Sequence, residues 1–134
     1  MTAWSHLAAP SLDDFAALAE GALRALPEDF LRLAGDVQMR VADFPDDEVL
    51  DELGAQDPFE ITGLYQGVDL TRRTVFDPQP HPSMVFLYRR PILDEWCERG
   101  DVPLGQLITH VLVHEIGHHF GLSDEDIAAI EAHA

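Results

Sequence analysis

The sequence predicts a single α+β domain in which a small three-stranded sheet packs with helices, and it allows the sheet to be mixed. The chain of 134 residues has room for one domain, and its 46% of apolar residues can fill a core. A helical hydrophobic pattern comes first, three short strand patterns follow, and helical patterns close the chain. We therefore expect residues 1–134 to form one domain.

The first helix is predicted to begin at Ser11. Apolar residues at helical spacing follow this serine: Leu12, Phe15, Leu18, Ala19, Ala22 and Leu26. Asp14 stands three residues after Ser11, which is the spacing of a capping pair, and Pro27 ends the pattern. A second, short helix is expected over residues 28–34, because a Gly-Asp pair follows it.

Three stretches have strand character. Residues 37–41 alternate between apolar and polar, residues 61–67 form a short strand interrupted by glycines, and residues 84–88 are all apolar or aromatic. The last pattern is typical of a strand buried on both faces. Residues 46–57 are acidic and are predicted to be a surface helix or loop. Residues 69–82 contain three prolines and are predicted to be a loop.

Three helices are predicted after the last strand. The first runs from Pro91 to Cys97 and is stopped by a glycine. The longest periodic segment runs from Pro103 to Phe120, and it is apolar in nearly every direction, as a buried central helix is. A last short helix begins at Ser123.

The charge balance excludes several classes of partner. With 25 acidic residues against 8 basic ones, the net charge is −17, and such a surface repels phosphate backbones and anionic lipid heads. We therefore expect neither nucleic acid nor a membrane as partner. We also recognise no signal-peptide pattern and no apolar stretch long enough to span a bilayer. Because Cys97 is the only cysteine, a reducing compartment is allowed, and we expect a cytoplasmic protein.

The longest predicted helix carries a pattern typical of a catalytic zinc site. His114 and His118 are four residues apart, so both imidazoles lie on one helix face, about 6 Å apart along the axis, and can bind one ion. Glu115 is rotated from His114 by about 100°, which makes it a poor ligand but lets it reach a water on the metal. The H-E-x-x-H pattern thus predicts two ligands and one general base.

A third protein ligand should follow, since catalytic zinc sites generally use three. Gly121 can enter the left-handed conformation that turns the chain back toward the helix. Asp124 could then reach the metal. Alternatively, it merely begins the next helix, with Ser123 and Asp126 as a capping pair. Glu131, from two turns further along, is the fallback ligand.

Other polar residues near the motif are expected to have structural roles. His110 lies about 12 Å from His118 along the helix axis, too far to share an ion with it, and should be a supporting or surface residue. Four residues are candidates to stabilise an oxyanion: Tyr65, Tyr88, Arg89 and Arg90. Strand packing for the tyrosines and ion pairs with the acidic surface for the arginines are the simpler expectations.

Three stretches resemble known zincins. The stretch His114-Glu-Ile-Gly-His-His-Phe-Gly-Leu-Ser-Asp124 resembles the H-E-x-x-H-x-x-G-x-x-D motif of the aspzincin metallopeptidases. Gly63-Leu-Tyr-Gln-Gly-Val68 and Leu87-Tyr-Arg-Arg-Pro-Ile92 are similar to motifs of a family of minimal bacterial zincin-like proteins. The resemblance implies a minimal zincin-like fold with an active-site helix at about residues 103–120. It also implies one zinc ion and these site residues: the metal ligands His114, His118 and Asp124, and the catalytic residue Glu115.

These observations predict a zinc-dependent metallopeptidase that hydrolyses peptide bonds with a metal-activated water. Its substrate should be a peptide or an unstructured protein, bound as an added strand at the sheet edge. The alternative is a non-catalytic zinc-binding interaction or scaffold protein that retains the site. Glu115 separates the two hypotheses, because a scaffold has no need of a general base.

Overall fold

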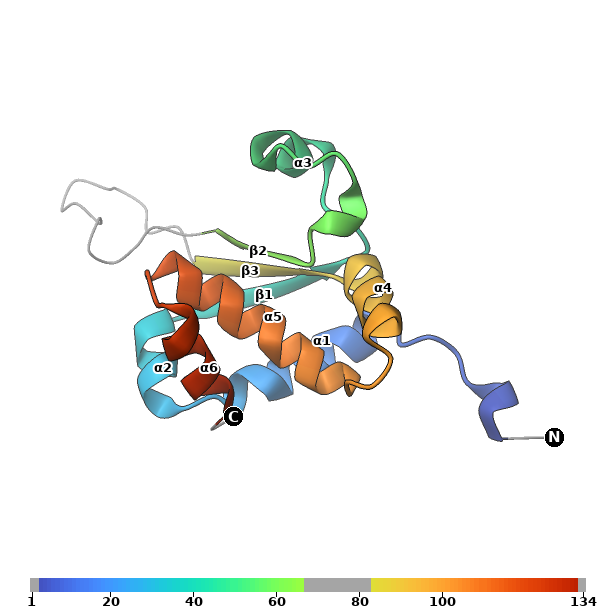
Figure 1. Cartoon of the computed structure of the whole chain (residues 1–134), viewed down its shortest axis with the longest axis horizontal. Helices are drawn as coiled ribbons and strands as arrows, with labels where there is room; N and C mark the ends of the chain where they lie inside the picture. Colours follow the sequence, from blue (N-terminus) through green and yellow to red (C-terminus); the bar gives the residue numbers. More distant parts are fainter. Residues whose placement is uncertain (1–2, 67–82, 133–134) are drawn as a thin grey trace.

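A mixed three-stranded sheet is at the centre of the fold (Figure 1). The computed structural model describes residues 3–66 and 83–132. In the sheet, β3 (Ser83–Tyr88) lies between β1 (Val37–Ala42) and β2 (Gly63–Gln66). β1 runs parallel to β3, and β2 runs antiparallel to it. The predicted small mixed sheet is therefore confirmed.

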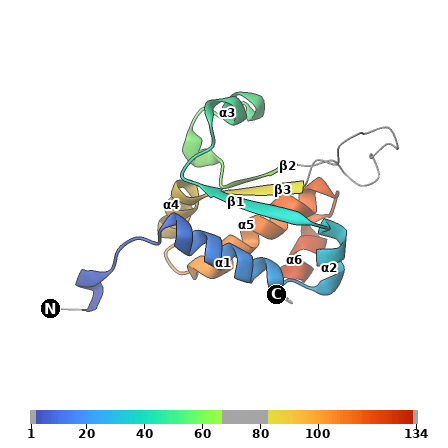
Figure 2. The ribbon, with the colours of Figure 1, turned by 180° about the vertical axis from the view of Figure 1, so that it is seen from behind.

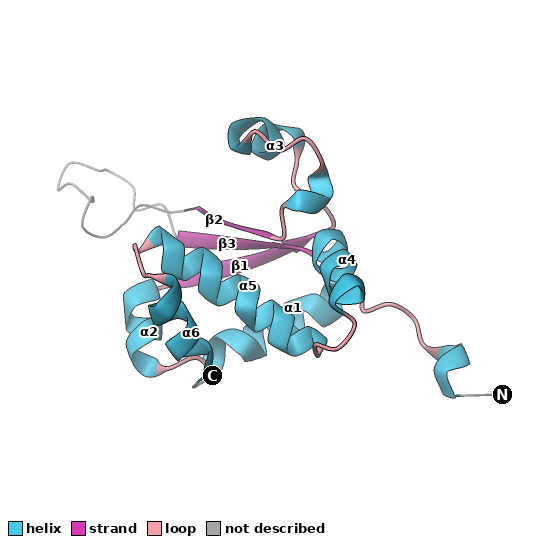
Figure 3. Cartoon of the chain, viewed as in Figure 1, coloured by secondary structure: helices cyan, strands magenta, loops and turns pink. Residues whose placement is uncertain are grey.

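Six α-helices accompany the sheet in the described part of the chain, which confirms the α+β class (Figure 3). They are α1 (Leu12–Arg24), α2 (Glu28–Ala34), α3 (Asp47–Leu53), α4 (Arg89–Arg99), α5 (Leu104–His119) and α6 (Asp124–Ala132), with two 3-10 turns, η1 (Ala3–His6) and η2 (Pro58–Glu60). α1 and α5 pack together on one face of the sheet, and α3 lies on the other side (Figures 1 and 2).

The helix ends follow the local sequence. The Ser11 hydroxyl accepts a hydrogen bond from the Asp14 N–H at 3.1 Å, and the Asp14 carboxylate accepts one from the Ser11 N–H at 2.8 Å. This is the predicted capping pair of α1. α2 has the predicted bounds and ends at Gly35, whose φ is 68°. α4 begins at Arg89, two residues before the predicted start at Pro91, because a proline is tolerated in the first turn, where its missing N–H has no helical partner.

The core lies between the sheet and the α1–α5 layer. Val85 and Leu87 of β3, Phe15 of α1 and Leu112 of α5 are fully buried. The opposite face of β3 is only partly covered, since Phe86 is half-buried and lines a cleft of about 390 Å³ below α3. The expectation that β3 is buried on both faces is therefore wrong. α3 has seven residues and buries none of them, so it is too short to close that face.

Two further expectations from the sequence concern the absence of a membrane-spanning helix and a loop before β3. Among residues 3–66 and 83–132, no helix combines the length and the apolar character that crossing a bilayer needs. The loop predicted over residues 69–82 lies outside the described residues.

Gly63 is the point where β2 touches α5. A Cβ at this position would lie 2.8 Å from Val111 Cγ1, 3.1 Å from the Phe86 carbonyl oxygen and 3.2 Å from Glu115 Cγ. Such distances are shorter than ordinary van der Waals contact, and one of the three atoms belongs to the backbone. Glycine therefore lets the strand approach the helix.

We expect Gly63→Ala to lower the free energy of unfolding by about 1–3 kcal/mol, because the methyl group overpacks the strand–helix contact. Urea unfolding measures this change. Gly21→Ala is the matched control: it lies within α1 with nothing within 4 Å of its would-be Cβ, and should raise the free energy of unfolding by about 0.5–1 kcal/mol. Two changes of the same sign would contradict the packing argument.

Candidate metal centre

α5 presents three histidines on one face, at intervals of four residues. His110, His114 and His118 follow one another turn by turn, while seven apolar or glycine positions of the helix are buried. The ring centroids of His110 and His114 lie 4.1 Å apart, and those of His114 and His118 lie 5.2 Å apart. His110 and His114 are half-buried, and His118 is exposed. We call these three residues the histidine row.

A glycine turn at the end of α5 brings α6 back along it. Gly121 has φ 76°, the predicted left-handed conformation. Its N–H donates to the His118 carbonyl at 3.1 Å, and the Leu122 N–H donates to the Gly117 carbonyl at 2.9 Å, which are the two hydrogen bonds of a Schellman motif. α6 then packs on α5 through Ile127. A Cβ on Gly117 would lie 3.0 Å from Ile127 Cγ1, so this glycine permits the close approach.

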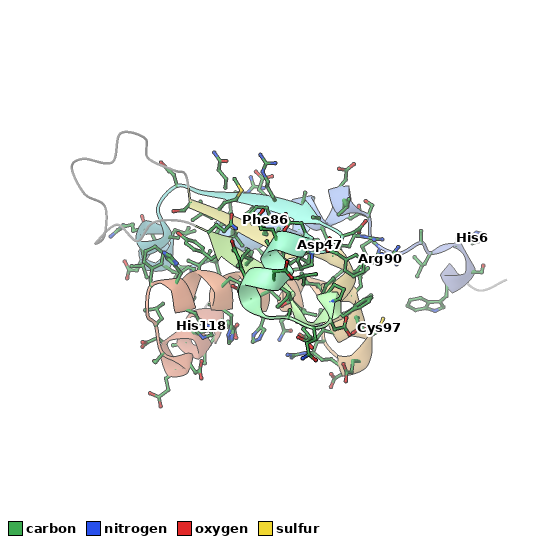
Figure 4. The ribbon with its side chains drawn as sticks, turned by 90° about the horizontal axis from the view of Figure 1, so that it is seen from above. His6, Asp47, Phe86, Arg90, Cys97 and His118 are labelled. Atoms are coloured by element: carbon green, nitrogen blue, oxygen red, sulfur yellow. The ribbon has the colours of Figure 1, made fainter. Side chains whose placement is uncertain are left out.

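The returning helix brings two carboxylates to the histidine row. Asp124 Oδ1 lies 3.4 Å from His118 Nε2, and both residues are exposed; Figure 4 labels His118. Two turns later, Glu131 Oε1 lies 2.7 Å from His110 Nδ1 and 3.8 Å from His114 Nε2. Within the described ranges, one compact group of three donors results, formed by His110, His114 and Glu131, with ligand atoms within 4.8 Å of one another.

Asp124 has a position that is compatible with both roles that the sequence left open. It is the first residue of α6, and Ser123 and Asp126 form the capping pair of this helix, with hydrogen bonds of 3.1 and 3.2 Å. Because Ser123 and Asp126 form the cap, the Asp124 carboxylate takes no part in it. This carboxylate is 91% exposed and lies beside His118. Its role as a metal ligand stays a prediction.

His110 lies one turn before His114, as expected, and has a contact with Glu131 that the sequence did not predict. It is too far along the axis from His118 to share an ion with it, but it lies one turn from His114, and Glu131 contacts both. The spacing of four residues between His110 and His114 equals that between His114 and His118, so the sequence already indicated that His110 and His114 share a helix face. Glu131 could not be placed from sequence, since its approach depends on how α6 packs against α5.

Glu115 is held at the edge of the sheet. Its carboxylate accepts a hydrogen bond from the backbone N–H of Tyr65, in β2. Burial raises the pKa of Glu115 above its ordinary value of 4.5, while His118 and the Tyr65 hydrogen bond act in the opposite direction. A carboxyl group whose pKa is raised toward neutrality is suited to accept and return a proton.

β2 is an edge strand of the described sheet, and its outer side faces this carboxylate. The Thr62 carbonyl accepts a hydrogen bond from the Tyr88 N–H at 3.0 Å, so these two residues form a hydrogen-bonded pair. Such pairs alternate along an antiparallel ladder, and the N–H and C=O groups of Gly63 and Tyr65 therefore point away from β3. The hydrogen bond from Tyr65 to Glu115 uses one of these outward groups.

The donor groups fit a zinc ion. Burial lowers the pKa of His114 below its ordinary value of 6.5, and His110 and His118 lower it further, while Glu131 and Asp124 act in the opposite direction. The ring is therefore neutral at neutral pH, as a metal ligand must be. Glu131 Oε1 is buried and receives no hydrogen bond, which a bound cation would compensate. Imidazole nitrogens and carboxylate oxygens are typical zinc donors.

Of the four oxyanion candidates, Arg89, Tyr65 and Tyr88 have the structural contacts that were expected. Arg90 donates its backbone N–H to the Asp43 carbonyl at 3.1 Å. Arg89 Nε donates to the Pro10 carbonyl at 2.6 Å, and its Nη1 donates to the Asp43 carboxylate at 3.0 Å. This confirms the expected ion pair for Arg89, which ties the segment before α1 to the end of the sheet. Tyr65 and Tyr88 are buried strand residues, and the Tyr65 ring packs on the His119 ring at 4.1 Å.

Residues 34–134 match the sequence model of the family described as zincin-like metallopeptidase. The chain belongs to this family. A comparison with curated proteins gave no match. The matched range includes the sheet, α5 and α6, and membership of the zincin-like metallopeptidases implies a metal-dependent peptidase lineage and zinc binding. The resemblance read from the sequence is thus confirmed at the level of the family.

We expect Glu115→Gln to raise the melting temperature of the metal-free protein at neutral pH, because it removes a charge whose desolvation opposes folding. Since the pKa of Glu115 is raised on folding, the penalty appears as pH rises through the folded pKa and vanishes below the ordinary value of 4.5. The melting temperatures of the two proteins should therefore converge at acid pH. Thermal unfolding in chelator, followed across this range, measures the difference. A constant difference at all pH values would contradict the assignment.

Proposed function

We propose that this protein is a zinc-dependent peptidase acting on extended, unstructured segments of peptides and proteins. The observation that carries the proposal is the position of Glu115: it lies one residue from His114, interacts with His118, and is hydrogen-bonded to the outer edge of β2. A potential base, two potential ligands and a strand that can pair with a peptide backbone thus adjoin one another.

His114, His118 and Asp124 would hold the ion in this proposal. The chemistry that bound zinc supplies is activation of a water and polarisation of the scissile carbonyl. Glu115 accepts the proton of the attacking water and returns it to the leaving amine. The raised pKa of the half-buried Glu115 supports this exchange, because its carboxylate then accepts a proton more readily than an ordinary carboxylate does.

The outer edge of β2 supports the choice of substrate. An extended peptide can pair with the outward backbone groups of Gly63 and with the outward Tyr65 carbonyl, while the Tyr65 N–H stays bonded to Glu115, and this would place the peptide backbone beside Glu115. Backbone pairing requires a substrate without competing structure and demands little of its side chains. The net charge of −17 favours basic over acidic segments.

We expect Glu115→Gln to reduce the cleavage of casein by at least about a hundredfold, because it removes the general base. The zinc content should stay at the wild-type level, because Glu115 is not a ligand. Cleavage is measured by gel electrophoresis and zinc by elemental analysis. Glu20→Gln, on the exposed side of α1, is the matched control and should leave both unchanged.

Equal cleavage by the wild type and Glu115→Gln would contradict the peptidase proposal, since the residual activity would then come from elsewhere. A zinc-binding protein with no cleavage in either form would belong to the alternative class of interaction or scaffold proteins.

We expect Asp124→Ala to lower the affinity for zinc at least about tenfold with the fold retained, and Glu131→Ala to lower it much less. The reason is that Asp124 adjoins His118, with which Glu115 also interacts, whereas Glu131 lies toward the other end of the histidine row. Competition with a chelator measures both affinities. The opposite ranking would make Glu131 the third ligand of the catalytic ion.

A further inference from the structure

His110 and Glu131 have no role in the proposed catalysis, yet they form the closest contact between a histidine and a carboxylate in the described residues. His110 Nδ1 and Glu131 Oε1 are 2.7 Å apart. The geometry is not that of a hydrogen bond, however, and Glu131 Oε1 stays buried without a donor. A buried carboxylate oxygen without a donor is costly, and a cation between the groups would remove this cost.

The surroundings of Glu131 Oε1 supply the other ligands for such a cation. His114 Nε2 lies 3.8 Å away, on the turn after His110. The three ligand atoms of His110, His114 and Glu131 all lie within 4.8 Å of one another. Two imidazoles and one carboxylate are a ligand set that zinc accepts, with a small shift of side chains to bring each atom to about 2 Å from the ion.

The compact group is also accessible. His110 and Glu131 line a cavity of about 370 Å³, which extends to Ala22 of α1 and Gln106 of α5. An ion can therefore reach the group without passing Glu115. From His110 to Glu115 the helix rotates by about 140° and rises about 7.5 Å, so the general base is far from this end of the row.

We propose that His110, His114 and Glu131 form a second zinc position, one turn of α5 away from the position beside Glu115. The two positions overlap, because each needs the His114 imidazole, and one ion occupies one or the other. Zinc in the second position binds without a base beside it. The histidine row thus provides a catalytic position and a resting position for the same ion.

Zinc binding by variants that separate the two positions tests this proposal. His118→Ala removes one ligand of the first position and leaves the second intact, and His118 is exposed, so the fold should tolerate the change. His118→Ala/Glu131→Gln and His118→Ala/Asp124→Ala are then compared with it. His114→Asn removes a ligand of both positions. His6→Ala, on the separate η1 turn far from His118, is the control (Figure 4).

Zinc affinity is measured by chelator competition, and the fold of each variant is checked by circular dichroism. We expect His118→Ala to keep one equivalent of zinc, His118→Ala/Asp124→Ala to bind as His118→Ala does, and His118→Ala/Glu131→Gln to bind at least about tenfold more weakly. Loss of zinc from His118→Ala to the level of His114→Asn would overturn the proposal. A lower zinc affinity in His118→Ala/Asp124→Ala, with no such decrease in His118→Ala/Glu131→Gln, would also overturn it. Because no cleavage is measured, these outcomes are independent of whether the protein is a peptidase.

Discussion

The position of α5 is the constraint on which the site depends, and two glycines set it. Gly63 lets β2 approach one side of the helix, and Gly117 lets α6 approach another. At each glycine no side chain separates the two elements, so the backbone packs directly on an apolar side chain: Val111 at Gly63 and Ile127 at Gly117. The first contact brings the sheet edge to Glu115, and the second brings the carboxylates of α6 to the histidine row. The chemistry of the centre thus follows from close packing at two positions that carry no functional group.

The same packing sets the electrostatics. α5 is apolar on its buried side, so the half-buried His114 and Glu115 are only partly hydrated. Burial moves the pKa of His114 down and that of Glu115 up, and both shifts favour the neutral form. A neutral imidazole is able to bind a metal ion, and a carboxylate with a raised pKa accepts a proton more readily than an ordinary one. Partial desolvation is the largest cause of both shifts.

The local features of this fold could be predicted from sequence because they depend on neighbouring residues. The capping pair of Ser11 and Asp14, the left-handed Gly121 and the H-E-x-x-H spacing are of this kind. The contacts of Glu131 depend on the angle at which α6 returns, which no spacing encodes. The half-exposed face of β3 likewise depends on the length of α3, which came from a stretch that the sequence left open between helix and loop.

The hydrogen bond from Tyr65 to Glu115 also bears on how this protein avoids self-association. An edge strand with unpaired backbone groups can template the strand of another molecule and so begin aggregation. β2 has four residues, and one of its outward N–H groups is already occupied by a carboxylate from α5. A second copy pairing there would have to displace that carboxylate while bringing its own strongly acidic surface close. The Glu115 carboxylate therefore also protects the sheet edge.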